Sequence, residues 1–249
     1  IQRQEAVSAE ALRKGSQQQA TQPADQTQQD RQPDSTEDNR VASLYASPYE
    51  AWEDMAIEGA VELDVDLISD GKNTVVGAIM EQIEMAGVHS GDSACVMPPQ
   101  SLNTDTEKEI IRISKKVARA LKVVGAANLQ LAIKEGDIFL LEANPRASRT
   151  LPFVSKSTGY PLARMAVNLM LGEKIKNLPD ILPIEGASVK VPTFSWLKIT
   201  GLDTVLGPEM KSTGEAMGHG PNFGTAYLKA MKGGNKKIPT SGTVFVSIS

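Results

Sequence analysis

Two apolar segments, "ANLQLAI" and "IFLLEAN", limit the fold more than any other part of the sequence, because a short polar link ending in "EGD" joins them. So short a link predicts an antiparallel β-hairpin. With 135–137 as the loop, Lys134 opposes Ile138, and counting back along both strands places Gln130 opposite Glu142. Asn144 shares the face of Glu142, because side chains alternate along a strand. Three oxygen-bearing side chains are therefore expected close together.

These residue types suit a hard cation and a phosphate group. Mg²⁺ accepts carboxylate and amide oxygens, and so few protein ligands leave room for phosphates and water. Arg146 and Arg149 follow directly, and guanidinium groups bind phosphate oxygens through paired hydrogen bonds. Cation and arginines together could hold a transferring phosphoryl group and neutralise its charge.

The spacing leaves a second interpretation open. Glu142 could form a salt bridge with one of the arginines, while Asn144 caps the turn before Pro145. The register is also an assumption, since a shift of one residue would move Gln130 to the opposite face.

A second hairpin is predicted upstream. From Val61, "VELDVDLI" alternates apolar and acidic side chains, which is typical of a half-buried strand with Glu62, Asp64 and Asp66 on one face. The Asp70–Gly71 pair then turns the chain into "TVVGAIM".

Helices are predicted at three places. Thr104 and Glu107 have the spacing of a capping box before a run of apolar residues at helical spacing. Pro161 suits the first position of a helix that ends before Gly172. Beyond Pro183, short strands and Gly-rich turns precede the helix-like "NFGTAYLKAMKGG". The mixture of hairpins and helices predicts an α+β lobe.

Composition narrows the function classes. Residues 1–50 are predicted to be a disordered Gln-rich tail, because 16–40 lack the apolar residues needed to offset the entropy of ordering. The net charge is −4 and the Lys and Arg residues are scattered, which does not suggest nucleic-acid binding. The apolar runs are too short to cross a membrane. Cys95 is the one cysteine, which excludes an internal disulfide and suits a reducing compartment.

Three motifs carry a family resemblance: "GVHSGDSAC", "NPRASRTLPFVSKSTGYPLA" and "LGPEMKSTGEAMG". They closely resemble the large subunit of carbamoyl-phosphate synthetase, and "PFVSK" with "STGE" resembles its second, carbamate-phosphorylating ATP-grasp half. The likeness runs from about Glu58 to the end of the chain. It implies an ATP-grasp C-terminal lobe over 55–182, the remainder of the ATP-grasp region over 183–240, and the first strand of a truncated allosteric domain over 241–249.

The resemblance also implies roles for single residues. Gln130, Glu142 and Asn144 match the metal-binding positions for Mg²⁺ or Mn²⁺, and Glu142, as the bridging ligand, lies near where K⁺ would be held. Arg146 and Arg149 match the phosphate-facing arginines. The nucleotide contacts that it implies are the ribose-binding Glu62 and the lining loop Gly87, Val88, His89 and Ser90.

The activity implied is a ligase that uses ATP to phosphorylate carbamate, in arginine and pyrimidine biosynthesis, in the cytoplasm or an organelle stroma or matrix. Partners implied are a glutaminase small subunit and a first synthetase half. The phosphate lid and adenine hinge are not visible before Glu58, so we expect a missing lobe in cis or trans and no catalysis by this chain alone. A noncatalytic or complementing module is an alternative. So is another ATP-grasp ligase, such as a biotin carboxylase or a D-alanine ligase, although "PFVSK" and "STGE" argue against it.

Overall fold

The computed structural model describes residues 59–176, 178–180, 182–196, 204–236, 238–239, 241–243 and 245. All of them belong to the unit of residues 47–249. The predicted tail over 1–50 lies outside the described residues, as do most of residues 241–249.

Within the described residues, seven strands form one sheet in the order β5-β4-β1-β2-β3-β6-β7, and neighbouring strands are antiparallel. The strands are β1 (Val61–Asp70), β2 (Thr74–Gln82), β3 (Cys95–Met97), β4 (Val124–Lys134), β5 (Asp137–Asn144), β6 (Ala187–Thr193) and β7 (Gly214–Gly220). The helices are α3 (Thr104–Ala120), α4 (Thr150–Thr158), α5 (Leu162–Met170) and α6 (Phe223–Gly233). The predicted α+β class is confirmed.

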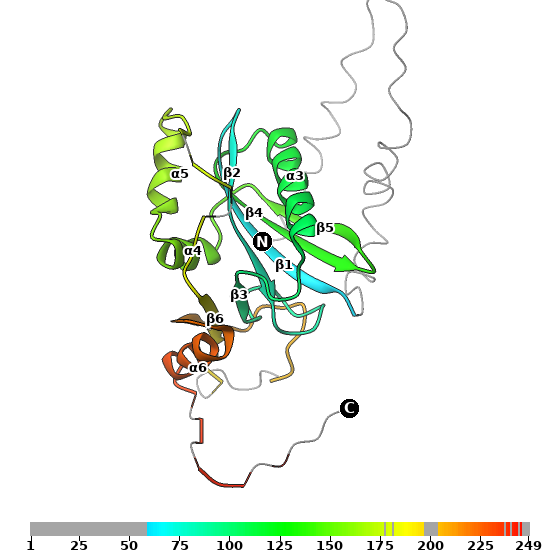
Figure 1. The fold of residues 1–249 in the computed structure, drawn as a ribbon, viewed down its shortest axis with the longest axis vertical. Coiled ribbons are helices and arrows are strands. Elements are labelled where there is room, and N and C mark those ends of the chain that lie inside the picture. Colours follow the sequence, from blue (N-terminus) through cyan, green and yellow to red (C-terminus); the bar gives the residue numbers. More distant parts are fainter. Residues whose placement is uncertain are drawn as a thin grey trace, which may run out of the picture. The chain divides into compact units, whose positions relative to one another are not determined.

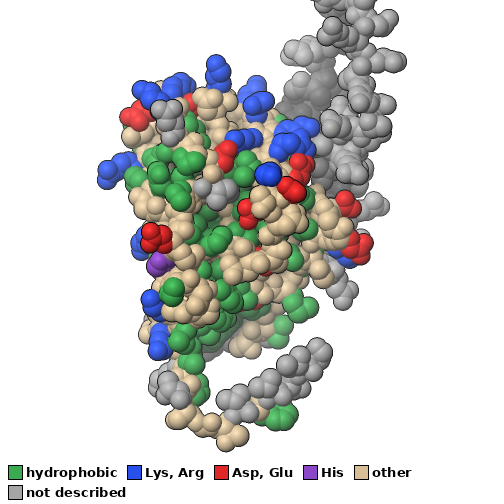
Figure 2. Space-filling model, viewed as in Figure 1, with side chains coloured by type: hydrophobic (Ala, Val, Ile, Leu, Met, Phe, Trp, Pro, Cys, Tyr) green, Lys and Arg blue, Asp and Glu red, His purple; other side chains and the backbone are tan. Residues whose placement is uncertain are grey.

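Helices cover both faces of the sheet (Figure 1). Alternation along β1 sends Leu67 into the core under α3 and Ile68 into the core under α4 and α5. A third core joins α6 to β6 and β7. In Figure 2, hydrophobic side chains occupy the centre of the face in view, and Lys and Arg gather mainly around its upper rim. In the described part of the chain, no helix is long and apolar enough to span a bilayer.

The β4–β5 hairpin differs from the prediction in its loop. Glu135 and Gly136 both have positive φ, 54° and 91°, which suits a two-residue turn whose twist matches the strands. Lys134 therefore pairs with Asp137, and the predicted three-residue loop is wrong. An extra residue in β5, Leu141, then shifts the register, so that Gln130 does pair with Glu142 as predicted.

Helix boundaries also differ from the predictions. The N-cap of α3 is Asn103 rather than Thr104, because the Asn103 side chain accepts hydrogen bonds from the backbone of Asp105 and Thr106 at 3.0 and 2.9 Å. Helix α5 begins at Leu162, one residue after Pro161. Helix α4 was not predicted, although Gly159, with φ of 75°, marks its C-terminal end.

The acidic face of β1 is the largest departure from the predicted local environment. A half-buried strand would leave Glu62, Asp64 and Asp66 in water, but their exposed fractions are 8%, 2% and 0%. Side chains of β2, β4 and the turn after β5 supply hydrogen bonds to Asp64 and Asp66, and the Gly87 amide donates one to Glu62. The expectation of a half-buried strand is therefore wrong, and β1 is buried on both faces.

Candidate functional site

The predicted metal-binding side chains gather at one edge of the sheet. Gln130 on β4 lies directly opposite Glu142 on β5, and Asn144 lies on the same face two residues further along. Strand β5 is the edge strand, so Glu142 is exposed, while Gln130 and Asn144 are half-buried. The three oxygen-bearing side chains are therefore close together and open on one side.

The hydrogen bonds leave oxygen atoms available for a cation. The Gln130 amide nitrogen donates to the Ser90 hydroxyl at 3.1 Å, which leaves Gln130 Oε1 without a partner in the described residues. Among the described residues, the Asn144 side-chain oxygen accepts a hydrogen bond only from Arg146, at 3.2 Å. This donor set fits a hard, oxygen-preferring cation such as Mg²⁺. The described residues contain no group of three or more His, Cys, Asp or Glu side chains that could hold a metal, and the set proposed here includes only one such residue.

The two arginines follow on the turn between β5 and α4, and both are exposed. The Arg146 guanidinium bonds Asn144 and the Ala147 carbonyl oxygen, and Arg149 Nη1 donates to the Ser212 hydroxyl at 3.3 Å. Within the described residues, Glu142 forms no ion pair with either arginine. The salt-bridge interpretation of Glu142 therefore finds no support in the structure.

The predicted nucleotide residues form a second group. The Gly87 amide donates to Glu62 Oε1 at 3.0 Å, which ties the loop to β1. Burial raises the pKa of Glu62, and the hydrogen bond from Gly87 opposes this. His89 Nδ1 accepts from the Gly91 amide at 3.0 Å, so the imidazole takes part in the loop's own structure. Val88 is half-buried in the same loop.

Ser90 joins this loop to the metal-binding group. Its hydroxyl accepts the hydrogen bond from Gln130, and its carbonyl oxygen accepts one from Lys190 Nζ at 3.3 Å. Lys190 comes from β6 and is only 1% exposed. Its charge opposes the rise that burial causes in the pKa of Asp64.

A further link runs to the "EMKSTGE" segment. Asp92 is fully buried and accepts hydrogen bonds from the backbone amides of Lys211 and Ser212 at 2.7 and 2.8 Å. The Ser212 hydroxyl in turn donates to the Gly91 carbonyl oxygen at 2.9 Å and accepts from Arg149. One arginine and the nucleotide loop are thus held by the same serine.

Two buried carboxylates, Asp64 and Asp66, lie on β1 next to the site residues of β4 and are called the floor of the site. Asn128 Nδ2 donates to both Asp64 and Asp66, at 3.3 and 3.0 Å, and Gln82 donates to Asp64 at 3.1 Å. The Ser148 hydroxyl donates to Asp66 at 2.8 Å. Burial raises the pKa of Asp66 to about 6, despite these hydrogen bonds. Its Oδ2 has no hydrogen-bond partner among the described residues.

Sequence reasoning missed several of these residues. Asp92, Ser148, Lys190 and Ser212 act through partners that are distant in the chain, so neither periodicity nor spacing identified them. Asp64 and Asp66 were visible in the alternation of β1, but a period of two does not show whether the polar face meets water or other polar groups.

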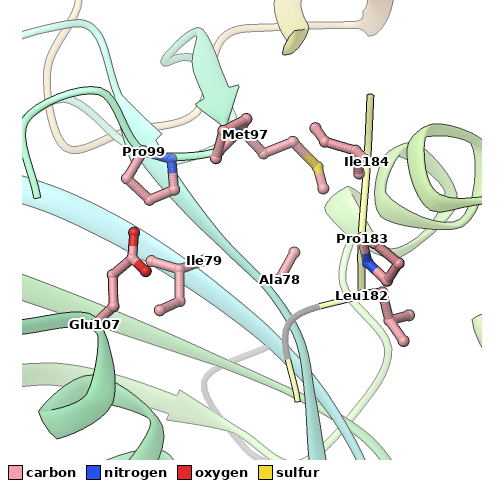
Figure 3. Close-up of a pocket in the computed structure, with 9 residues that line it drawn as sticks. Ala78, Ile79, Met97, Pro99, Glu107, Leu182, Pro183 and Ile184 are labelled. Carbon is pink, nitrogen blue, oxygen red and sulfur yellow. The ribbon is translucent and has the colours of Figure 1, made fainter. Parts of the chain in front are cut away.

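A cavity of about 140 Å³ lies apart from this site (Figure 3). Its lining is mainly apolar and comes from β2, β3, the start of α3 and the segment 182–184, with Glu107 as its one carboxylate. No predicted site residue lines it.

Solved structures of low sequence identity share this fold. Urea carboxylase from Kluyveromyces lactis matches with a TM-score of 0.55 and 14% identity, over 70% of this chain and 18% of that one. Urea amidolyase from K. lactis matches with a TM-score of 0.56 and 14% identity, over 78% and 14%. The antiparallel sheet and its helices form a partial α+β lobe of the ATP-grasp class.

Sequence comparison gives the family. The family described as "Carbamoyl-phosphate synthase L chain, ATP binding domain" matches residues 40–178. The carbamoyl phosphate synthase large chain of Archaeoglobus fulgidus is 52% identical over 197 residues, which are 78% of this chain and 18% of the relative. The C-terminal section of that large chain in Methanocaldococcus jannaschii is 49% identical over 207 residues, 78% of this chain and 34% of the relative. This chain belongs to the carbamoyl-phosphate synthase L chain, ATP-binding domain family, and it spans between 18% and 34% of these relatives.

Proposed function

We propose that this chain forms the metal- and phosphate-binding wall of the ATP-grasp half that phosphorylates carbamate in a carbamoyl-phosphate synthase. The observation that carries the proposal is the pairing of Gln130 with Glu142 beside the turn that bears Arg146 and Arg149. The match to a relative named as a C-terminal section supports the second half rather than the first.

The roles follow from the donor set. Gln130, Glu142 and Asn144 would hold Mg²⁺ or Mn²⁺, with Glu142 as the bridging ligand and K⁺ nearby. When bound, the metal supplies charge neutralisation at the phosphates of ATP. Arg146 and Arg149 would bind the oxygens of the transferring group through charge-assisted hydrogen bonds.

The nucleotide would lie against the loop of residues 87–90. Glu62 is proposed to accept a hydrogen bond from the ribose, in addition to the bond from Gly87 that the structure contains. Gly87, Val88, His89 and Ser90 would line the nucleotide, with His89 as a contact rather than a proton carrier, because its Nδ1 already accepts a hydrogen bond.

The rest of the enzyme, including the lobe that would face this one across the nucleotide, is proposed to lie outside the described residues. We assign 55–182 to the ATP-grasp C-terminal lobe, 183–240 to the rest of the ATP-grasp region and 241–249 to the start of an allosteric domain. An opposing lobe and a first synthetase half, in cis or in trans, and a glutaminase small subunit would complete the enzyme in the cytoplasm or an organelle. Carbamate is unstable in water, so the complete site must exclude water.

Binding of Mn²⁺ to this chain tests the metal site. Paramagnetic broadening of amide signals should centre on Gln130, Glu142 and Asn144. Glu142→Gln should weaken Mn²⁺ binding about tenfold or more, because it removes the one charged ligand. Mutation of residues that only hydrogen-bond to a metal ligand already lowers metal affinity about tenfold or more. The matched control is Glu135→Gln, an exposed carboxylate in the turn of the same hairpin. Broadening centred elsewhere, or equal effects of the two substitutions, would contradict the proposal.

A further inference from the structure

The turn between β5 and α4 carries both arginines, and Ser148 lies between them. The Ser148 hydroxyl donates to Asp66 Oδ1 at 2.8 Å. It also accepts a hydrogen bond from the Leu151 amide at 3.1 Å and shares one with the Thr150 hydroxyl at 2.8 Å, in which either oxygen could be the donor. One side chain thus joins the turn to the start of α4 and to the sheet.

Asp66 is a rigid point of attachment. It lies on the central part of the sheet in β1, is 0% exposed, and its Oδ1 also accepts from Asn128 at 3.0 Å. Asn128 is two residues from Gln130 on the same face of β4, and it pairs with Asn144 on β5. The attachment point of the turn therefore belongs to the same strands as the metal-binding group.

Within the described residues, the arginine side chains of the turn reach the sheet only at the end of its edge strand β5. Arg146 bonds Asn144 and Ala147, which are its neighbours in the chain. Arg149 reaches Ser212, which lies outside the sheet strands, before β7. Among the described residues of the turn, Ser148 is the one whose side chain bonds a residue of β1.

We propose that Ser148, held by Asp66, is a positioning residue that sets where Arg146 and Arg149 lie relative to Gln130 and Glu142. This inference rests on the proposed function, in which the two guanidinium groups bind phosphate. Ser148 itself does not touch the phosphate. It fixes the backbone of the turn, and misplacing that backbone weakens binding by both arginines.

The test uses this chain and inorganic tripolyphosphate, a probe that requires the arginines but not the nucleotide loop. A titration in the presence of Mg²⁺ is followed by the ¹⁵Nε signals of Arg146 and Arg149. Ser148→Ala should weaken tripolyphosphate binding roughly fivefold to tenfold, which is the size of the net contribution of one typical hydrogen bond. Ser148→Thr keeps the hydroxyl and should restore the affinity to within about twofold.

Ser155→Ala is the matched control. In the described part of the chain, the Ser155 hydroxyl bonds only backbone groups: the Leu151 carbonyl oxygen at 2.8 Å in the same helix, and the Leu162 amide at 3.2 Å in the next. It should lower the thermal midpoint about as much as Ser148→Ala while leaving tripolyphosphate affinity unchanged. Thermal unfolding of each variant separates loss of folding from loss of positioning.

The outcomes distinguish the two levels of inference. If the arginine signals of the unsubstituted chain do not respond to tripolyphosphate, the proposed phosphate site is wrong, and the role of Ser148 falls with it. If they respond and Ser148→Ala binds as tightly as the unsubstituted chain, only the positioning role is overturned. Failure of Ser148→Thr to restore affinity, or an equal loss in Ser155→Ala, would also overturn that role.

Discussion

Asp66 is a carboxylate whose surroundings disfavour its charged form. It is fully buried beside Asp64, and the two carboxylates share the amide group of Asn128. Burial raises the pKa of Asp66 from 3.8 to about 6. The folded chain therefore binds this proton more tightly than the unfolded chain between about pH 4 and pH 6. The free energy of unfolding should fall as the pH rises through that window, because the ionised Asp66 carboxylate is more stable in the unfolded chain, where water solvates it.

Asp66→Asn should remove this pH-dependent penalty. The amide keeps an acceptor for Ser148 and Asn128 and carries no charge. A shift of about two pKa units corresponds to about 3 kcal/mol, so we expect the variant to be more stable than the unsubstituted chain by up to about 3 kcal/mol at pH 8. At pH 4 the difference should nearly vanish. Urea unfolding at both pH values measures it.

Asp70→Asn serves as a control of opposite sign. Backbone hydrogen bonds, chiefly from Asn73 and then from Lys72, lower the pKa of Asp70, so its ionised form stabilises the fold above its ordinary pKa. Its replacement should destabilise the chain at pH 8. If Asp66→Asn also destabilises the chain at pH 8, then the hydrogen bonds to ionised Asp66 outweigh the cost of burying its charge, and the expected penalty does not exist.

At the scale of elements, the packing of α6 on β7 depends on a residue without a side chain. Gly218 faces α6, and a Cβ built at this position would overlap the backbone of Ala226 and Ala230. These atoms belong to a helix and cannot move aside as a flexible side chain could. Gly218→Ala should therefore force α6 away from the sheet and open the core that it forms with Val189.

The expected cost of Gly218→Ala is about 3 kcal/mol in the free energy of unfolding, at the upper end of ordinary overpacking. Gly224→Ala is the comparison within α6 itself, because its nearest neighbour is 3.8 Å away. Alanine suits a helix better than glycine, so Gly224→Ala should be neutral or stabilising by up to about 1 kcal/mol. Denaturant unfolding of both variants checks this, and equal effects would show that α6 can shift without cost.

The β4–β5 hairpin shows what a sequence pattern can predict. The pairing of Gln130 with Glu142 was predicted although the loop was wrong, because the two-residue turn at Glu135 and the extra residue Leu141 displace the register in opposite directions. Turn type depends on backbone angles that glutamate rarely adopts, and a bulge has no periodic signature. Hairpins and the α+β class were predictable because alternation and short links report local geometry.

The floor of the site was not predictable for a different reason. Asp66 and Ser148 are 82 residues apart, and neither has a neighbour in sequence that indicates the contact. The family resemblance points only to expected ligand contacts. Asp66, Asp92 and Lys190 instead form hydrogen bonds with Ser148, with the Ser212 amide and with the Ser90 carbonyl oxygen. Burial of these polar groups follows from the tertiary arrangement, which a single sequence does not specify locally.

At the scale of the molecule, the groups proposed to bind phosphate lie on an open edge. Glu142, Arg146 and Arg149 are exposed, and β5 has a neighbour on one side only among the described strands. Two unit charges 4 Å apart gain about 1 kcal/mol in water but about 4 kcal/mol at a typical protein surface. A second wall over the phosphates would therefore strengthen every charge contact of this site.

We accordingly expect this chain alone to bind Mg·ATP with a dissociation constant of about 1 mM or weaker. A polypeptide that carries an opposing ATP-grasp lobe, sought in the unmatched part of the Archaeoglobus fulgidus large chain, should tighten binding more than tenfold in calorimetry. The same mixture with Arg149→Ala should lose most of that gain, because the closed site would lack one of its cations. Nanomolar binding by the chain alone would contradict this expectation, since the exposed wall would then suffice. Equal affinity with and without the added lobe would mean that the charges at this edge bind Mg·ATP without an opposing surface. The described residues alone would then form the complete binding site.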